Sequence, residues 1–171
     1  ASSTYNNAWY LSTDGAGHSL VPLVTSGQTN GVLDYYGNWR ASTYINGSPG
    51  AADPAPLATN VVLNEVMAHT DYTNGALWQD SNDWIELYNG VLSGVNLGNW
   101  YLSDDGGNLK KWAIPANTIA ATNWRTFFEV GGFHPATNSG FGINEDGEQV
   151  YVSYLPGNTS DRVADCVSFK G

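Results

Sequence analysis

The chain has 171 residues, of which 42% are hydrophobic, so it is long enough and apolar enough to build the core of one domain. It carries 16 acidic against 6 basic residues, and the formal net charge of −10 repels a phosphate backbone and argues against nucleic-acid binding. No hydrophobic run approaches the roughly 20 residues of a membrane-spanning helix, and the single cysteine, Cys166, allows no disulfide within the chain.

Short alternations of hydrophobic and polar residues recur along the chain, and no long segment has the spacing of an amphipathic helix. Turn signals such as DDGG (104–107), EDGE (145–148) and PGN (156–158) separate them. In chain order the predicted strands are residues 18–24, 60–68, 83–89, 99–104, 110–115, 124–130, 148–155 and 162–169. Short strands at this spacing predict an all-β sandwich or barrel.

Residues 40–58 interrupt this pattern, because they are rich in Pro, Gly, Ala and Ser and show no long alternation. We interpret them as a linker with a domain boundary near residue 56. The first 40 residues are too few for a core of their own, yet they contain the aromatic clusters NNAWYL and DYYGNW. We expect them to pack on the main domain, on a partner chain or on an upstream domain.

Alternation assigns the faces of the predicted strands. In 83–89, Ile85 and Leu87 share one face, and burying them is worth about 1.5–3 kcal/mol each. We therefore expect them in the core, with Trp84, Glu86 and Tyr88 on the opposite face, since burying an unpaired carboxylate costs more than that gain.

Two other strands need an extra feature to satisfy their side chains. In 60–68 the alternation changes parity, and a β-bulge near Asn64–Glu65 restores it. In 162–169, Val163, Val167 and Phe169 share a face with Asp165, which then needs a hydrogen-bond donor.

Groups that carry catalysis are scattered along the chain. The histidines His18, His69 and His134 lie in unrelated segments, and no nucleophile-elbow, phosphate-loop or H-E-x-x-H motif is present. Glu65 and Glu86 offer a carboxylate pair for glycosidic chemistry, but both read as outward or edge residues. Cys166 reads as a packed thiol. We predict that the protein is not an enzyme.

Two non-catalytic sites remain as candidates. Asp80, Asp83, Asp104 and Asp105 lie in the loops WQDSND and SDDGGN and offer oxygen ligands for a structural Ca²⁺, although neither loop has the full calcium-loop pattern and Asp-Asp-Gly-Gly also forms plain turns. The outward face of Trp84, Glu86 and Tyr88 has the aromatic and acidic side chains of a carbohydrate site. The alternative is that a loop or residues 1–40 cover its aromatic rings.

Six segments that occur in order resemble the lamin tail domain, an immunoglobulin-like β-sandwich of nuclear lamins and of many bacterial secreted or surface proteins. They are VVLNEVMA (61–68), DWIELYNG (83–90), VNLGNWYLSDD (95–105), KWAIPANTIA (111–120), GFGINEDGEQVYV (140–152) and RVADCVSF (162–169). The bacterial version is the closer likeness. The resemblance implies such a sandwich over residues 57–171, with no catalytic residues to carry over.

The front of the chain resembles the segment that closes such a unit, through DGAGHSLVPL (14–23) and NWRAS…NGSPGAADP (38–54). Residues 1–56 are therefore expected to be the closing segment and linker of a preceding unit. By the same resemblance, we expect the sandwich at 57–171 to lack a closing segment of its own and so to have an open edge. We expect the strand at 14–24 to fill that edge, either on its own chain or on a neighbouring copy.

The function that this resemblance implies is structural. We expect a spacing, adhesion or assembly module of a larger secreted or cell-surface protein, with other copies or neighbouring domains as partners, no membrane insertion, and no cofactor besides the candidate Ca²⁺. The alternative is a carbohydrate-binding module, with a glycan partner, of an extracellular multidomain enzyme.

Overall fold

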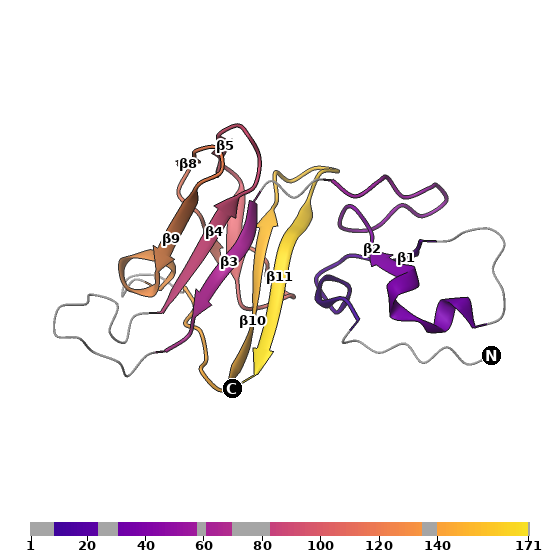
Figure 1. Cartoon of the computed structure of the whole chain (residues 1–171), viewed down its shortest axis with the longest axis horizontal. Coiled ribbons are helices and arrows are strands. Elements are labelled where there is room, and N and C mark those ends of the chain that lie inside the picture. Colours follow the sequence, from indigo (N-terminus) through magenta and orange to yellow (C-terminus); the bar gives the residue numbers. More distant parts are fainter. Residues whose placement is uncertain (1–8, 24–30, 58–60, 70–82, 135–139, 171) are drawn as a thin grey trace.

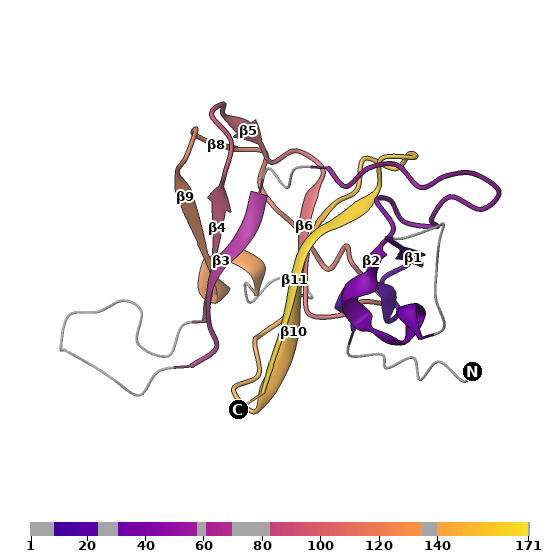
Figure 2. The same cartoon turned by 45° about the vertical axis from the view of Figure 1, so that its right-hand side comes forward.

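The computed structural model describes residues 9–23, 31–57, 61–69, 83–134 and 140–170. Two antiparallel sheets face each other as a β-sandwich, which confirms the predicted immunoglobulin-like all-β class, and the N-terminal segment lies beside one of them (Figures 1 and 2). Helical turns within these ranges are η1 (Leu11–Thr13), η2 (Val32–Asp34), η3 (Tyr36–Asn38) and η4 (Glu129–Phe133). None of the described helices is long and apolar enough to cross a membrane.

The first sheet contains, in spatial order, β3 (Val61–Met67), β4 (Trp84–Asn89) and β9 (Trp124–Phe128). The second contains β11 (Arg162–Lys170), β10 (Gly147–Tyr154), β6 (Trp100–Ser103) and β7 (Trp112–Ala113). Two short pairs join β5 (Val95–Asn96) to β8 (Thr118–Ile119) and β1 (Leu20–Pro22) to β2 (Trp39–Ala41). Each of the eight predicted strands coincides with one of these. β2, β5 and β8, of two or three residues each, were not predicted.

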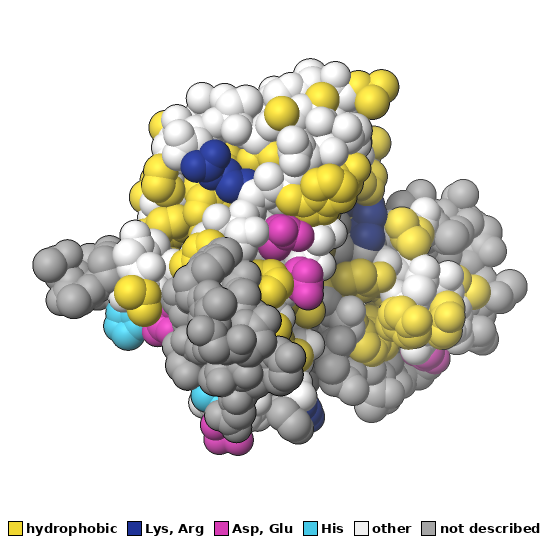
Figure 3. Space-filling model, turned by 60° about the vertical axis from the view of Figure 1, so that its left-hand side comes forward, with side chains coloured by type: hydrophobic (Ala, Val, Ile, Leu, Met, Phe, Trp, Pro, Cys, Tyr) yellow, Lys and Arg dark blue, Asp and Glu magenta, His cyan; other side chains and the backbone are white. Residues whose placement is uncertain are grey.

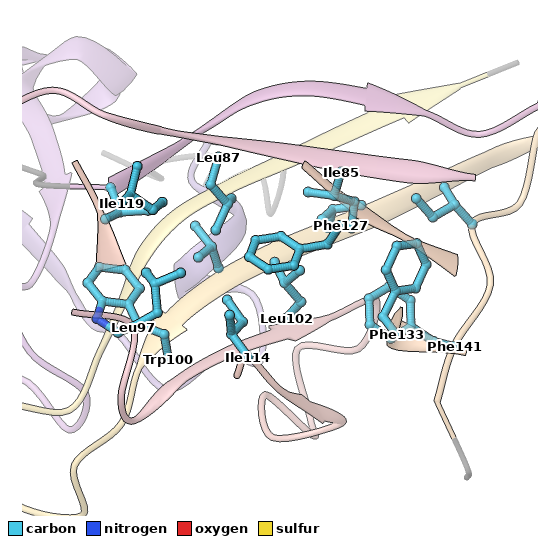
Figure 4. Close-up of a cluster of buried hydrophobic side chains, with 14 residues drawn as sticks. Ile85, Leu87, Leu97, Trp100, Leu102, Ile114, Ile119, Phe127, Phe133 and Phe141 are labelled. Carbon is cyan, nitrogen blue, oxygen red and sulfur yellow. The ribbon is translucent and has the colours of Figure 1, made fainter. Parts of the chain in front are cut away.

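Hydrophobic side chains from both sheets fill the space between them (Figure 4). Ile85 and Leu87 of β4 are fully buried in one cluster with Leu102 of β6 and with Val150 and Val152 of β10. The predicted inward face of β4 is thereby confirmed. Because each such side chain stabilises the fold by about 1.5–3 kcal/mol, this cluster holds the two sheets together.

The predicted bulge in β3 is present. The register of β3 against β4 shifts between Leu63 and Glu65, so that Leu63 lies opposite Leu87 and Val66 lies opposite Ile85. The shift lets residues of both parities face the core, which an unbroken alternation forbids.

A second bulge, in β11, corrects one prediction. Val152 lies opposite Asp165 but Ser153 lies opposite Val163, so Ala164 is the extra residue. Val163 therefore points to the face opposite Asp165, and not to the same face as predicted. The donors that Asp165 was predicted to need are the backbone N–H groups of Leu63 and Cys166, at 3.0 and 2.9 Å.

Residues 9–23 and 31–57, called here the N-terminal unit, lie against the outer side of the β10–β11 sheet in both views (Figures 1 and 2). Tyr151 alternates with the core residues Val150 and Val152 and so points outward, yet it is fully buried. Burial raises the pKa of Tyr151 to about 12. Ala16 of the N-terminal unit, itself buried, lies at Gly106 beside the Tyr151 ring.

Within the described residues 14–23, no strand is added to either large sheet. The strand β1 of this segment pairs with β2, with Val21 opposite Arg40. The beginning of the predicted linker is also structured, because Ser42 and Thr43 are buried. Residues 49–57 are exposed apart from Asp53.

One ion pair organises the N-terminal unit. The Asp53 carboxylate accepts hydrogen bonds from the Arg40 guanidinium at 2.5 Å, from the Ser48 hydroxyl at 2.9 Å and from the Thr43 N–H at 3.1 Å. Burial by itself raises the pKa of Asp53, but these bonds together hold it below its ordinary value. The unit is thus closed by local contacts that do not involve the sandwich.

Candidate functional site

The outer side of the β3–β4–β9 sheet carries the residues that the sequence singled out for ligand binding. Trp84, Glu86 and Tyr88 are partly exposed, while Ile85 and Leu87 between them are buried. The register of β9 places Phe128, Thr126 and Trp124 directly opposite Trp84, Glu86 and Tyr88, in that order. We call the outward side chains of these six residues the aromatic face.

Glu86 lies in the middle of this face and is held by its neighbours. Its carboxylate accepts hydrogen bonds from Asn64 Nδ2 at 2.8 Å and from Thr126 Oγ1 at 3.1 Å. Glu65 of β3 lies opposite Glu86 in the register, so the fold does bring the two carboxylates of the sequence-based pair together. Glu65 is exposed and Glu86 is partly exposed. Figure 3 shows two acidic side chains surrounded by hydrophobic ones on one face of the molecule. Like charges directly opposite each other destabilise a sheet, and the hydrogen bonds from Asn64 and Thr126 to Glu86 offset this repulsion. The partly exposed carboxylate oxygens offer acceptors to a ligand.

Trp124 is the residue that sequence reasoning missed. Its ring lies 5.1 Å from the Tyr88 ring, tilted by 35°, and 53% of the residue remains exposed. Leu92, in the loop after β4, is 91% exposed. Residues 1–40 were one possible cover for Tyr88, but the described part of that segment lies on the other sheet (Figure 1). Nothing local in WRTFFEV indicates that Trp124 meets Tyr88, since strand register is set by tertiary packing.

The acidic loops hold their carboxylates in separate contacts. Asp83 is buried and accepts a hydrogen bond from the Ile143 N–H at 2.9 Å. Burial raises the pKa of Asp83, the nearby Glu129 charge raises it further, and the Ile143 N–H opposes the shift. At the other loop, Asp104 pairs with Lys111 Nζ at 2.5 Å.

Asp105 closes the DDGG turn by accepting a hydrogen bond from the Gly107 N–H at 2.8 Å. Asp80 lies outside the described residues. Within the described ranges, no group of three or more His, Cys, Asp or Glu side chains is placed to hold a metal ion.

The three histidines occupy three separate settings. His69 Nε2 lies 3.8 Å from Glu145 Oε2, and His134 Nδ1 lies 2.8 Å from Glu129 Oε1. His18 is buried where the N-terminal unit meets β11.

Burial raises the pKa of the Cys166 thiol to about 11, which suits a packed thiol and not a nucleophile.

A cavity of about 240 Å³ lies at this junction. The N-terminal unit supplies one wall and β11 the other, with His18, Arg162, Asp165 and Cys166 as its titratable or charged lining residues. Arg162 lies over the Tyr154 ring at 4.8 Å and donates to the Ser160 carbonyl. Asp165 accepts hydrogen bonds from two backbone N–H groups. The charged residues that line the cavity therefore make contacts that stabilise the fold.

The chain was compared with known proteins. The model of the Lamin Tail Domain family matches residues 54–166. This range contains every strand of the two large sheets except the last four residues of β11, and it contains the aromatic face. No curated protein matches the chain.

Proposed function

The chain belongs to the Lamin Tail Domain family, and from that premise we propose that it is a non-catalytic structural module that works in adhesion or assembly within a larger secreted or cell-surface protein. The module is an immunoglobulin-like sandwich, and its carboxylates engage backbone and cross-strand partners. The proposal that this module assembles with other copies rests on how the N-terminal unit contacts the sandwich.

The observation that carries the proposal is the docking of the N-terminal unit on the edge of β11. Ile45 N–H donates to the Asp161 carbonyl at 2.9 Å, and the Val163 N–H donates to His18 Nε2 at 2.9 Å. A strand edge that accepts a docked segment from its own chain offers the same groups to that segment of another copy. The exposed stretch 49–57 connects the docked segment to the sandwich.

Light scattering coupled to size-exclusion chromatography tests this proposal on the full chain over a wide concentration range. Exchange of the N-terminal unit predicts dimers and larger species that increase with concentration. The Trp124→Ala variant serves as the control, because it removes association through the aromatic face and leaves the β11 edge unchanged. A monomer at every concentration contradicts self-assembly.

A second function, carbohydrate binding, is favoured by one observation: exposed Trp124 and half-buried Tyr88 form a ring pair on the same face as the Glu86 carboxylate. Sugar rings present apolar faces that stack on aromatic rings and hydroxyls that donate to carboxylates. The net charge of −10 and the adjacent Glu65 disfavour acidic glycans, so the ligand class is a neutral polysaccharide.

Affinity electrophoresis through gels that contain neutral polysaccharides tests the second function. Retardation that Trp124→Ala abolishes supports it, with Tyr36→Ala as the matched control, since Tyr36 is equally exposed at 53% but lies in the N-terminal unit. Equal mobility of the wild type and Trp124→Ala in every gel contradicts it.

A further inference from the structure

Among the described residues of the N-terminal unit, His18 is the titratable side chain that hydrogen-bonds to β11. His18 is only 7% exposed. Its Nδ1 lies 2.7 Å from the Ser42 carbonyl oxygen, and its Nε2 lies 2.9 Å from the Val163 backbone nitrogen. A carbonyl only accepts and a backbone N–H only donates, so Nδ1 carries the proton and Nε2 must be bare. The contact therefore requires a neutral imidazole.

We propose that protonation of His18 releases the N-terminal unit from the edge of β11, so that acidification undocks it. In the imidazolium both ring nitrogens carry hydrogens, and the added hydrogen on Nε2 points at the Val163 N–H. The hydrogen bond is lost, and two donors face each other in a buried position. Among the described residues, the Ile45–Asp161 bond, the contact of the Ser12 backbone with the Cys166 thiol and the packing of Ala16 beside Tyr151 remain, so protonation weakens the docking and does not remove every contact.

The surrounding charges do not compensate for this loss. On the side of the N-terminal unit, Asp53 attracts a proton to His18, but its carboxylate is already paired with Arg40. On the β11 side, Arg162, Asp165 and Cys166 line the shared cavity. Arg162 opposes a cation, the thiol stays neutral, and the Asp165 carboxylate is taken by the N–H groups of Leu63 and Cys166.

Linkage sets the pH window. Burial lowers the pKa of docked His18 below its ordinary value of 6.5, and the Ser42 carbonyl and Asp53 only partly restore it. The undocked unit therefore binds the proton more tightly. The contribution of His18 to docking is fully present above pH 6.5 and weakens as pH falls, by at most tenfold in the docking equilibrium constant per pH unit, until the docked pKa is passed.

Release leaves the Val163 N–H and the Asp161 carbonyl of the β11 edge unpaired. Such groups recruit a strand or a segment from another chain. Acidification would then promote exchange between copies. That consequence rests on the proposed assembly function, whereas the protonation step does not, so the two are tested separately.

The experiment uses nuclear magnetic resonance on the full chain between pH 4.5 and pH 8. One measurement follows the titration of each histidine ring. The other follows the protection factor of the Ile45 amide against hydrogen exchange, which reports docking without involving His18 directly. We expect Ile45 protection to fall, by up to tenfold per pH unit, over the range in which His18 titrates.

His18→Gln provides a side-chain oxygen that can accept from Val163 and does not titrate, so Ile45 protection should then be independent of pH. His69→Gln is the matched control, because it removes a histidine that follows β3 and pairs with Glu145. This variant should keep the pH dependence of Ile45 protection seen in the wild type. If His18→Gln is undocked even at pH 8, the wild-type measurements test the proposal. Loss of Ile45 protection over the same pH range as the His18 titration supports it, and loss over a different range overturns it.

Two further outcomes overturn the proposal. One is a wild type in which Ile45 stays protected at a pH where His18 is charged. The other is acid release that persists in His18→Gln or that Asp165→Asn abolishes, since either would assign the release to a different group.

Discussion

The carboxylate of Asp165 on β11 accepts a hydrogen bond from the backbone N–H of Leu63 on β3 at 3.0 Å, across 102 positions of sequence. This bond joins one sheet of the sandwich to the other at the edge where β11 contacts β3. Leu63 comes just before the bulge in β3, where the β-ladder is locally interrupted. The Asp165 side chain supplies an acceptor at that point.

Asp165→Ala is expected to lower the free energy of unfolding by about 1–3 kcal/mol, because it leaves the N–H groups of Leu63 and Cys166 without acceptors. Asp165→Asn keeps a side-chain oxygen and should lose less than the alanine variant. Urea unfolding followed by tryptophan fluorescence measures both. Equal stability of the wild type and the alanine variant would show that water satisfies these groups.

We expect the Asp165 carboxylate to make the stability of the protein depend on pH. Burial raises the pKa of folded Asp165 above its ordinary value of 3.8, although both N–H bonds oppose the shift. The folded state therefore takes up a proton before the unfolded state does, and stability relative to Asp165→Asn should rise as pH falls through the folded pKa toward 3.8. Urea unfolding of the two proteins between pH 3 and pH 7 measures this difference, and a constant difference would contradict it.

Core packing predicts a large contrast between two leucines. Leu102 is fully buried between the sheets and Leu92 is 91% exposed in a loop. Leu102→Ala should cost about 2–5 kcal/mol through lost burial and a cavity. Leu92→Ala should change the stability by less than about 0.5 kcal/mol. Thermal and urea unfolding of both variants provide the comparison.

The Tyr88–Trp124 pair should contribute a measurable coupling to sheet stability. Exposed aromatic pairs across strands are worth about 0.5–1.5 kcal/mol beyond their burial. A double-mutant cycle with Tyr88→Ala and Trp124→Ala isolates this value. A coupling near zero would mean that the rings are neighbours without stabilising each other, and would leave them free to separate around a ligand.

The Arg40–Asp53 pair should control the order of the N-terminal unit. Asp53→Asn removes the charge that meets Arg40 and should cost the unit roughly 1.5–3 kcal/mol, since hydrogen bonds to charged groups are the stronger ones. Because the folded pKa of Asp53 lies below 3.8, its contribution in the wild type is present above that pH and is lost as pH falls through the folded pKa. Amide exchange of Thr43, which donates to this carboxylate, reports the effect.

Residues close together in the chain account for what could be predicted. The alternation in DWIELYN placed Ile85 and Leu87 in the core and Glu86 on the outside, because side-chain direction in a strand has a period of two residues. The parity change in β3 indicated its bulge, since only an extra residue lets both parities face the core. The bulge in β11 was missed because its alternation does not break, and Val163 was therefore assigned to the wrong face.

The sequence by itself determined the all-β class, the positions of the long strands and which side of β4 faces the core, because these depend on local periodicity. Only the tertiary structure decided that Trp124 lies beside Tyr88, that Leu63 supplies a donor to Asp165, and that His18 meets Val163 from 145 positions away. Such pairings depend on the register and packing of whole sheets. No segment carries that information alone, because each strand's register is settled by burying the combined hydrophobic surface of all the others.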